Sequence, residues 1–178
     1  MRIHPGEAQR EDGYQDSSYR VTEREKTMQA RMADVYRLAS GGYQAMAAME
    51  QFLQGSGVPQ HILELVRLRT GQINGCGTCV DLHAHRAHEA GESNERLWAV
   101  AAWRDAPYFT DQERAALALT EAATRIADNP GGVPDDIWDQ AAKHFDESSL
   151  AALVMAIASA NAWNRINVTT RRIAGSYR

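Results

Sequence analysis

The stretch "LELVRLRTGQINGCGTCVDLHAHRA", residues 63–87, holds two helical patterns with a break between them. Apolar residues recur at intervals of three and four up to Asn74, as on one face of a helix, and Pro59 suits the first turn of that helix. Gly75 marks the break. A second helix is expected over Cys76–Ala90, so both cysteines of the chain lie in its first turn. The stretch therefore predicts a helix–turn–helix unit with a C-x-x-C pair at the start of the second helix.

Helical patterns continue on both sides of this unit. Upstream, a capping box at Thr22–Glu25 and apolar residues from Met28 to Leu38 predict a helix that ends at Gly41-Gly42. An amphipathic helix over Tyr43–Leu53 is expected next. Downstream, the expected helices cover 94–104, 110–127 behind the capping box Thr110–Glu113, 134–145, and a final segment from about Asp146 to Arg171.

The same patterns decide the fold class. No segment alternates apolar and polar residues with the period of two that a half-buried strand needs. We therefore predict an all-α fold, with about seven to eight helices in one compact domain over residues 21–178. Residues 1–20 are rich in charge, glycine and serine, and we expect a polar, flexible leader to which we assign no role.

Charge and composition exclude several classes of function. The 178 residues are 44% hydrophobic and 24% charged, with a net charge of −4 and no run of lysines or arginines, so we expect neither nucleic acid nor a membrane as a partner. The first residues lack the apolar segment of a secretory signal, and the longest apolar run, 150–158, is too short to span a bilayer. We therefore expect a cytoplasmic protein. In that reducing setting a lone C-x-x-C is catalytic or metal-binding more often than structural.

The two cysteines share one predicted helix face with a histidine. Each helical residue advances by about 100°, which places Cys79 about 60° and His83 about 20° from Cys76 in projection. Cys79 and His83 are four residues apart and can touch, whereas Cys76 and His83 are roughly 10 Å apart along the axis. His83 is therefore the expected proton acceptor for Cys79, whose thiol is also acidified by the helix N-terminus.

Three kinds of site remain open for this pair. A thiolate can attack a peroxide to give a sulfenic acid, with which a second thiol three residues away condenses to a disulfide. A zinc site would have only three ligands, Cys76, Cys79 and His83, with no second motif to complete a tetrahedron. Inert buried cysteines are the third reading, since free cysteine is often part of a core. We favour the redox pair and expect neither a metal nor a cofactor.

Glu64, Cys76, Cys79 and His83 together resemble the active-site signature of the AhpD-like alkylhydroperoxidases, within the carboxymuconolactone decarboxylase superfamily. Glu64 stands twelve positions before Cys76. Residues 63–87 resemble the core of that family, as do "FTDQERAALALTEAATRI", 109–126, and "ANAWNRINV", 160–168. The resemblance covers the chain from about Tyr43 to Arg172. It implies an all-α homotrimer or homohexamer that reduces hydroperoxides and is recharged by a dithiol or by a dihydrolipoyl group on a partner.

The resemblance also implies a role for each site residue. Cys79 corresponds to the thiol that attacks the peroxide, and His83 to the base that deprotonates it. Glu64 corresponds to the carboxylate that completes a proton relay. Cys76 would be the resolving thiol, more exposed than Cys79 and the first to meet an external reductant.

At two positions, Thr78 and Glu64, the sequence leaves open whether the residue takes part in this proton relay. Thr78 stands where the best-studied relay of the family has a second histidine, and a hydroxyl does not take up a proton near neutral pH as imidazole does. A shorter relay, weaker activity or a different substrate would follow. From the residues alone, Glu64 could also be an exposed side chain or an ion-pair partner of Arg67 or Arg69.

We therefore predict a thiol-dependent hydroperoxide reductase with two alternatives. One is a lipoyl-linked or general disulfide oxidoreductase that uses the same thiols. The other is a non-catalytic, redox-sensing oligomeric binding module, in which oxidation of the cysteines changes assembly or partner binding.

The final predicted helix places an amide on an apolar stripe. The stripe consists of Leu150, Leu153, Val154, Ile157 and Asn161. A buried amide must be hydrogen-bonded, because its desolvation is otherwise costly. We expect the polar group Asn161, Trp163, Asn164 and Arg165 to brace the active-site helix or a subunit interface.

Overall fold

The computed structural model describes residues 28–177, which form eight α-helices and one 3-10 turn and contain no strand. The elements are α2 (Val35–Leu38), α3 (Ser40–Gln54), α4 (Gln60–Asn74), α5 (Gly77–Glu89), α6 (Asn94–Ala99), η1 (Val100–Ala102), α7 (Asp111–Thr124), α8 (Asp135–His144) and α9 (Glu147–Thr170). The predicted all-α class is confirmed. The expected leader, residues 1–20, and the capping box at Thr22–Glu25 lie outside the described residues.

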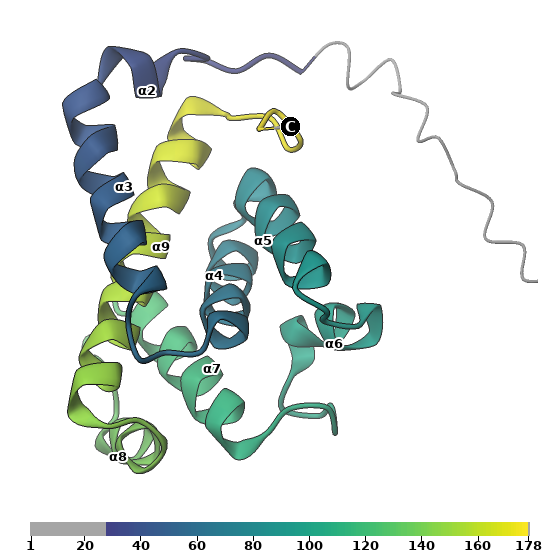
Figure 1. Ribbon diagram of the computed structural model, residues 1–178, viewed down its shortest axis with the longest axis vertical. Coiled ribbons are helices and arrows are strands. Elements are labelled where there is room, and N and C mark those ends of the chain that lie inside the picture. Colours follow the sequence, from purple (N-terminus) through teal and green to yellow (C-terminus); the bar gives the residue numbers. More distant parts are fainter. Residues whose placement is uncertain (1–27, 178) are drawn as a thin grey trace, which may run out of the picture.

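Helix α4 lies at the centre of the bundle, between α9 and α3 on one side and α5 on the other, with α7 across its lower end (Figure 1). Its two apolar faces enter two separate cores. Ile62, Leu63 and Val66 pack with residues of α3, α7, α8 and α9 in one core. Leu65 and Leu68 join α5, α6, η1 and α7 in the other. Burying one such side chain contributes about 1.5–3 kcal/mol, so α4 is a rigid base for the residues it carries.

Two glycines allow α4 and α5 to pack closely. Gly75 has a φ of 66°, a left-handed conformation that ends α4 and turns the chain directly into α5. A Cβ at Gly71 would lie only 3.3 Å from the Cβ of Cys79 and 3.3 Å from the backbone nitrogen of Val80. The hairpin predicted from residues 63–87 is confirmed, and glycine is what lets its two helices approach at Cys79.

Helix α9 is the longest element, with 24 residues. Asp146 caps its first turn through the backbone N–H of Ser149, and Arg171 ends it with a φ of 53°. The chain then returns over the start of α5, where the C-terminal segment lies in Figure 1. Both ends of α9 are therefore fixed, which places its last turns against the C-x-x-C pair.

The predicted first helix is wrong in its extent. Of residues 28–39, only Val35–Leu38 are helical, and Met28 and Met32 lie in irregular chain. Gly41 and Gly42 do not end a helix, because they occupy the first turn of α3. Backbone N–H groups in a first turn have no intrahelical partner, so glycine is cheaper there than in a helix interior.

Two further expectations need correction. The helix predicted over 94–104 ends at Ala99 and tightens into η1, a common form of last turn. On α9, Val154 is not part of the buried stripe, since 39% of it is exposed. The capping box Thr110–Glu113, in contrast, is present as predicted at the start of α7.

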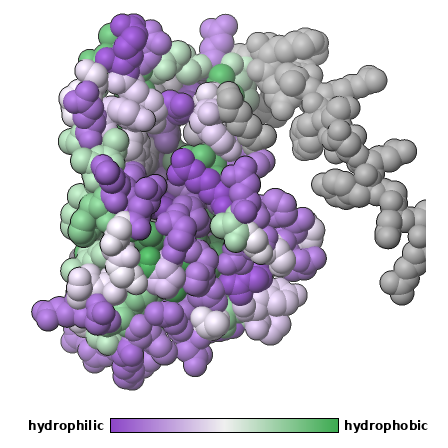
Figure 2. Space-filling model, viewed as in Figure 1, coloured by the Kyte–Doolittle hydropathy of each residue, from purple (hydrophilic) through white to green (hydrophobic). Residues whose placement is uncertain are grey.

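Polar side chains cover most of the visible surface, with apolar side chains along the flank where α3 lies (Figure 2). Large exposed apolar residues include Leu38 on α2, Tyr43 and Phe52 on α3, and Val154 and Met155 on α9. Between residues 28 and 177, no helix has both the length and the apolar content needed to cross a membrane.

Candidate active site

The C-x-x-C pair forms a disulfide at the N-terminus of α5. Cys76 is the N-cap residue, and its Sγ accepts the backbone N–H of Cys79 at 3.3 Å. The two Cα atoms are 5.3 Å apart across the disulfide. A sulfur at this position faces the positive end of the helix dipole, which favours a thiolate once the disulfide is reduced.

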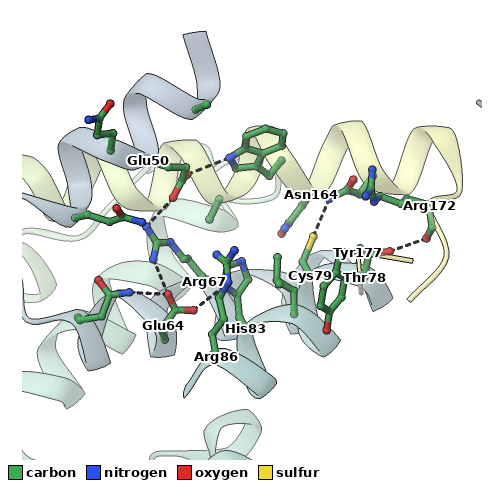
Figure 3. Close-up of a pocket in the computed structure, with 18 of the residues that line it drawn as sticks. Glu50, Glu64, Arg67, Thr78, Cys79, His83, Arg86, Asn164, Arg172 and Tyr177 are labelled. Atoms are coloured by element: carbon green, nitrogen blue, oxygen red, sulfur yellow. Dashed lines mark hydrogen bonds and ion pairs between the residues drawn. The ribbon is translucent and has the colours of Figure 1, made fainter. Parts of the chain in front are cut away.

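A cavity of about 810 Å³ opens beside Cys79 between α3, α4, α5 and the end of α9 (Figure 3). Cys79, His83 and Glu64 all line it, although Glu64 lies on a different helix from the other two. The structure therefore places three of the four residues that the sequence singled out on the wall of one cavity. Cys76 lines a second cavity of about 530 Å³ instead.

Glu64 and His83 form a hydrogen-bonded pair. Glu64 Oε2 lies 2.7 Å from His83 Nδ1, and only 1% of Glu64 is exposed. An ionised carboxylate can only accept, so Nδ1 carries the proton of the neutral ring and donates it. The nitrogen left to accept a proton is Nε2. The pair thus has the tautomer that a general base needs.

A buried arginine holds the other oxygen of Glu64. Arg67 donates from Nη1 to Glu64 Oε1 at 2.7 Å and from Nη2 to Glu50 Oε2 at 2.7 Å. Glu50 Oε1 in turn accepts from Ser159 Oγ at 2.6 Å and from Trp163 Nε1 at 3.0 Å. This chain of contacts joins α3, α4, α5 and α9, so the orientation of Glu64 is fixed by most of the helices around the cavity.

The same contacts set the protonation state of Glu64. Burial by itself raises its pKa, but the hydrogen bond and charge of His83, with the charges of Arg67 and Arg86, bring the pKa below its ordinary value. Glu64 is therefore ionised at neutral pH. The sequence alternatives are resolved: Glu64 is not exposed, and it pairs with Arg67 as well as with His83.

Asn167 contacts the sulfur of Cys79. Its Nδ2 donates to Cys79 Sγ at 3.3 Å, while its Oδ1 accepts from the hydroxyl of Tyr36 at 2.5 Å. Burial raises the pKa of Tyr36 against the opposing charge of Arg172, so this hydroxyl keeps its proton and orients the amide. Reasoning from the sequence missed Asn167. The available signal was the repeat of asparagine every third residue at Asn161, Asn164 and Asn167.

Thr78 does not replace the missing histidine. It is buried, and its Oγ1 donates to the backbone oxygen of Arg172 at 2.7 Å. The hydroxyl therefore ties the end of the chain to α5 and has no hydrogen bond to Cys79 or His83 among the described residues. Among the described residues, His83 is the one imidazole that lines this cavity.

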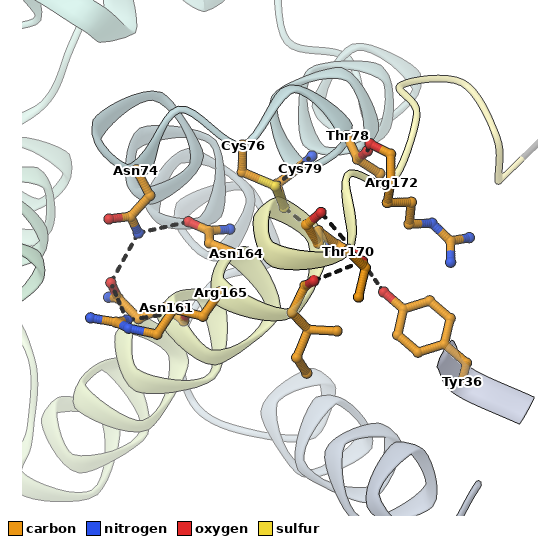
Figure 4. The surroundings of a disulfide bond; sticks show 12 residues. Tyr36, Asn74, Cys76, Thr78, Cys79, Asn161, Asn164, Arg165, Thr170 and Arg172 are labelled. Carbon is orange, nitrogen blue, oxygen red and sulfur yellow. Dashed lines mark hydrogen bonds between the residues drawn. A yellow bond between two sulfur atoms is a disulfide. The ribbon is translucent and has the colours of Figure 1, made fainter. Parts of the chain in front are cut away.

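The other amides of α9 hold the turn before the cysteines. Asn74 Nδ2 donates to Asn161 Oδ1 at 3.0 Å and to Asn164 Oδ1 at 2.8 Å (Figure 4). Asn161 also donates to Thr124 Oγ1 at 3.2 Å, so its buried amide is satisfied. Asn161 and Asn164 do brace the site, but they hold Asn74, the last residue of α4, and not the active-site helix α5 that we expected.

One expectation about access is wrong. Cys76 is 1% exposed and Cys79 3% exposed, so Cys76 is not the more accessible sulfur. Residues 167–168 of α9 and residues 171–174 after it line the cavity beside Cys76, a contact between distant parts of the chain that local sequence does not predict. His83 and Cys79 line one cavity but have no direct hydrogen bond in the disulfide form, in which Cys79 carries no proton.

The fold and the site define an all-α protein with a C-x-x-C disulfide at a helix N-terminus beside a buried carboxylate–histidine pair. Residues 42–122 match the carboxymuconolactone decarboxylase family. The chain is also 33% identical over 141 residues to the uncharacterised protein YdfG of Bacillus subtilis (strain 168), an alignment that covers 79% of this chain and 95% of YdfG. The chain belongs to the carboxymuconolactone decarboxylase family.

Solved structures support the same assignment. ATU0492 of Agrobacterium tumefaciens, a protein of unknown function provisionally named an AhpD antioxidant defence protein, is 32% identical with a TM-score of 0.77, over 82% of this chain and 98% of that one. The expected AhpD-like fold is confirmed. The debrominase Bmp8, solved with 2,3,4-tribromopyrrole, is 15% identical with a TM-score of 0.70, over 84% of this chain and 79% of its own. That likeness concerns the fold alone, which thus serves more than one chemistry.

Proposed function

We propose that this chain is a thiol-dependent hydroperoxide reductase that cycles through the Cys76–Cys79 disulfide. One observation carries the proposal: Cys79, already paired with Cys76, lines the same cavity as the buried Glu64–His83 pair. A nucleophile, a base and a carboxylate that orients the base are the parts that such chemistry needs.

The proposed reaction begins with reduced cysteines. His83 Nε2 takes the proton of Cys79, and the thiolate attacks one peroxide oxygen. The O–O bond breaks, the alkoxide leaves with a proton returned by His83, and Cys79 becomes a sulfenic acid. The Cys76 thiol then attacks the Cys79 sulfur, which forms the disulfide and releases water. A dithiol restores both thiols, so one hydroperoxide and one dithiol give an alcohol, water and a disulfide.

Each side chain has a defined part in this scheme. Glu64 keeps the tautomer of His83 and stabilises the imidazolium that forms after proton transfer. Asn167 donates to the Cys79 sulfur and stabilises its thiolate. Because Thr78 is occupied by the backbone of Arg172, one imidazole carries the whole proton transfer.

The experiment is hydroperoxide consumption by the purified chain with dihydrolipoamide or dithiothreitol. Turnover is expected in the natural chain and is expected to vanish in Cys79→Ser and His83→Ala. His88→Ala is the matched control, because His88 lies on the same helix, is exposed and is not part of the cavity. Consumption that continues unchanged in Cys79→Ser would overturn the proposal.

The resolving role of Cys76 needs its own measurement. In the natural chain, one equivalent of hydroperoxide should remove both thiols without further oxidation. In Cys76→Ser, Cys79 has no partner thiol, so mass spectrometry should detect its oxidation to sulfinic acid. Loss of both thiols with disulfide reductase activity but no peroxide turnover would instead favour the disulfide oxidoreductase.

The partners and setting belong to the same proposal. We propose a small hydroperoxide as substrate, a dithiol or lipoyl-type reductant, a cytoplasmic location and a homotrimer or homohexamer. The large apolar side chains exposed on α2, α3 and α9 support self-association, since such surface is usually covered in an assembly. Light scattering on the protein as it elutes from a size-exclusion column measures the number of chains in the assembly.

A further inference from the structure

One wall of the cavity beside Cys79 is aromatic. The rings of Tyr36, Tyr43 and Trp163 come from α2, α3 and α9, and their centroids lie 5.1, 5.6 and 5.9 Å apart in pairs. All three line the cavity. Aromatic side chains in contact form a large apolar surface on which a flat or branched hydrocarbon packs well. The proposed peroxide reduction uses the Tyr36 hydroxyl and the Trp163 N–H through hydrogen bonds, but it makes no use of the faces of these rings.

The charged side chains of the cavity fall into two groups. Glu50 and Glu64 both form salt bridges with Arg67, so these three charged groups are paired with one another. Arg86 and Arg172 also line the cavity, and neither forms a salt bridge with a carboxylate within residues 28–177, although the charge of Arg86 reaches Glu64. In the view of Figure 3, Cys79 lies between Arg86 and Arg172. Arg172 additionally stacks over the ring of Tyr36, with its Cζ 4.6 Å from the ring centroid.

Position along α5 separates Arg86 from Glu89, the one carboxylate among the described lining residues of the cavity that Arg67 does not bind. At 1.5 Å per residue, Arg86 lies about 10 Å along the axis from Cys79, one turn beyond His83. Glu89 lies about 15 Å from Cys79, at the outer end of the cavity. Along α5, an anion near the sulfur is therefore closer to the Arg86 guanidinium than to the carboxylate of Glu89.

We propose that the cavity selects hydroperoxides that carry a carboxylate on an aromatic or similarly flat apolar body. The inference rests on the proposed hydroperoxide reductase function. The positive charges of Arg86 and Arg172, on either side of Cys79 in Figure 3, attract the carboxylate, the aromatic wall takes the body, and the peroxide group lies at Cys79. Arginine matches carboxylate geometry with two parallel hydrogen bonds, and a cavity of about 810 Å³ holds a ligand of that size. The carboxylate is unchanged in the reaction, and the O–O bond breaks as described above.

The first test is binding, which does not depend on turnover. Calorimetry on the full chain in its disulfide form compares para-isopropylbenzoate with para-isopropylbenzamide, which has the same shape without the charge. We expect the carboxylate to bind about tenfold more tightly. Arg86→Gln and Arg172→Gln should each reduce this preference several-fold, and the double variant should abolish it.

Arg171→Gln is the matched control, since Arg171 neighbours Arg172, carries the same charge and does not line this cavity. Its preference should equal that of the natural chain. Circular dichroism of each variant checks the fold. Equal affinity for benzoate and benzamide, or a preference that survives in the double variant, overturns the inference.

The second test is the ratio of kcat/KM for para-carboxycumene hydroperoxide to that for cumene hydroperoxide. A ratio of about ten that falls in Arg86→Gln and Arg172→Gln, but not in Arg171→Gln, supports the inference. Turnover of both peroxides at equal kcat/KM overturns the inference and leaves the reductase function standing. No turnover of either, with the binding preference intact, overturns the reductase function and supports the carboxylate site.

Discussion

At the scale of single residues, Asn167 is the side chain that hydrogen-bonds the sulfur of Cys79. Its amide nitrogen is 3.3 Å from Cys79 Sγ, and the Tyr36 hydroxyl fixes the amide from the other side. A donor at this distance stabilises a thiolate more than a thiol. Substitution of Asn167 therefore offers a way to measure how much of the acidity of Cys79 comes from tertiary structure.

We expect Asn167→Leu to raise the pKa of the Cys79 thiol by about one to two units, because a hydrogen bond to a charged group contributes about 1.5–3 kcal/mol. The pH dependence of alkylation by iodoacetamide, measured with Cys76→Ser as the parent, gives this pKa. Tyr36→Phe should shift it in the same direction by less, because the amide is kept but loses its orientation. An unchanged pKa in Asn167→Leu would show that the contact does not act on the thiolate.

Arg67 is the residue on which the site depends for stability. It is 4% exposed and neutralises two carboxylates, Glu50 and Glu64. Arg67→Gln leaves both carboxylates without their cation, so we expect a loss of about 3–5 kcal/mol in the free energy of unfolding at pH 7. Urea denaturation measures it, with the exposed Arg125→Gln as control. The pKa of Glu64 should also rise, since Arg67 is one of the charges that lower it.

At the scale of elements, the turn from α4 to α5 was predictable because its signals are local. Gly75, the helical spacing before it and the C-x-x-C pair after it lie within one short stretch. The prediction of the first helix was wrong because its end signal was ambiguous. The glycines at its supposed end are also compatible with the first turn of α3. The contact of Asn167 with Cys79 joins residues 88 positions apart and has no local signal. The burial of Cys76 likewise depends on the end of α9.

Close packing of α4 on α5 gives a prediction for two glycines of the same stretch. In Gly71→Ala the new Cβ meets Cys79 and the backbone of Val80 at 3.3 Å, so we expect a loss of about 1–3 kcal/mol in the free energy of unfolding. Gly77→Ala is the matched control, since nothing lies within 4 Å of its Cβ. It should be neutral or stabilising by up to about 1 kcal/mol. Equal effects in urea denaturation would contradict close contact between the helices.

At the scale of the whole molecule, two carboxylates connect the helices, the buried Glu64 and the partly buried Glu121. Glu64 joins α4 to α5 and, through Arg67 and Glu50, to α3 and α9. Glu121 on α7 accepts from Arg69 of α4 at 2.8 Å and from Trp103 at 3.0 Å, and it also pairs with Arg104. Each carboxylate is a point at which several elements are joined, and the two lie in separate parts of the bundle.

Both carboxylates predict the direction in which stability changes with pH. Burial raises the pKa of Glu121, but hydrogen bonds from Arg104, Trp103 and Arg69 bring it below its ordinary value, as the partners of Glu64 do for that residue. A carboxyl whose pKa is lower in the folded state binds fewer protons there than in the unfolded chain. Its contribution is therefore fully present above the unfolded pKa of about 4.3 and is lost as the pH falls through the folded pKa.

We accordingly expect the free energy of unfolding to fall steeply below about pH 4.3 and the fall to be shallower in Glu64→Gln/Glu121→Gln. That variant should be less stable at pH 7, because glutamine forms weaker hydrogen bonds with arginine than a carboxylate does. Urea denaturation at a series of pH values between 7 and about 3 measures both effects. Asp139→Asn, which alters an exposed carboxyl on α8, is the control and should keep the natural slope. A slope in the double variant as steep as in the natural chain would mean that other carboxyl groups control the acid response and that the two connected networks do not.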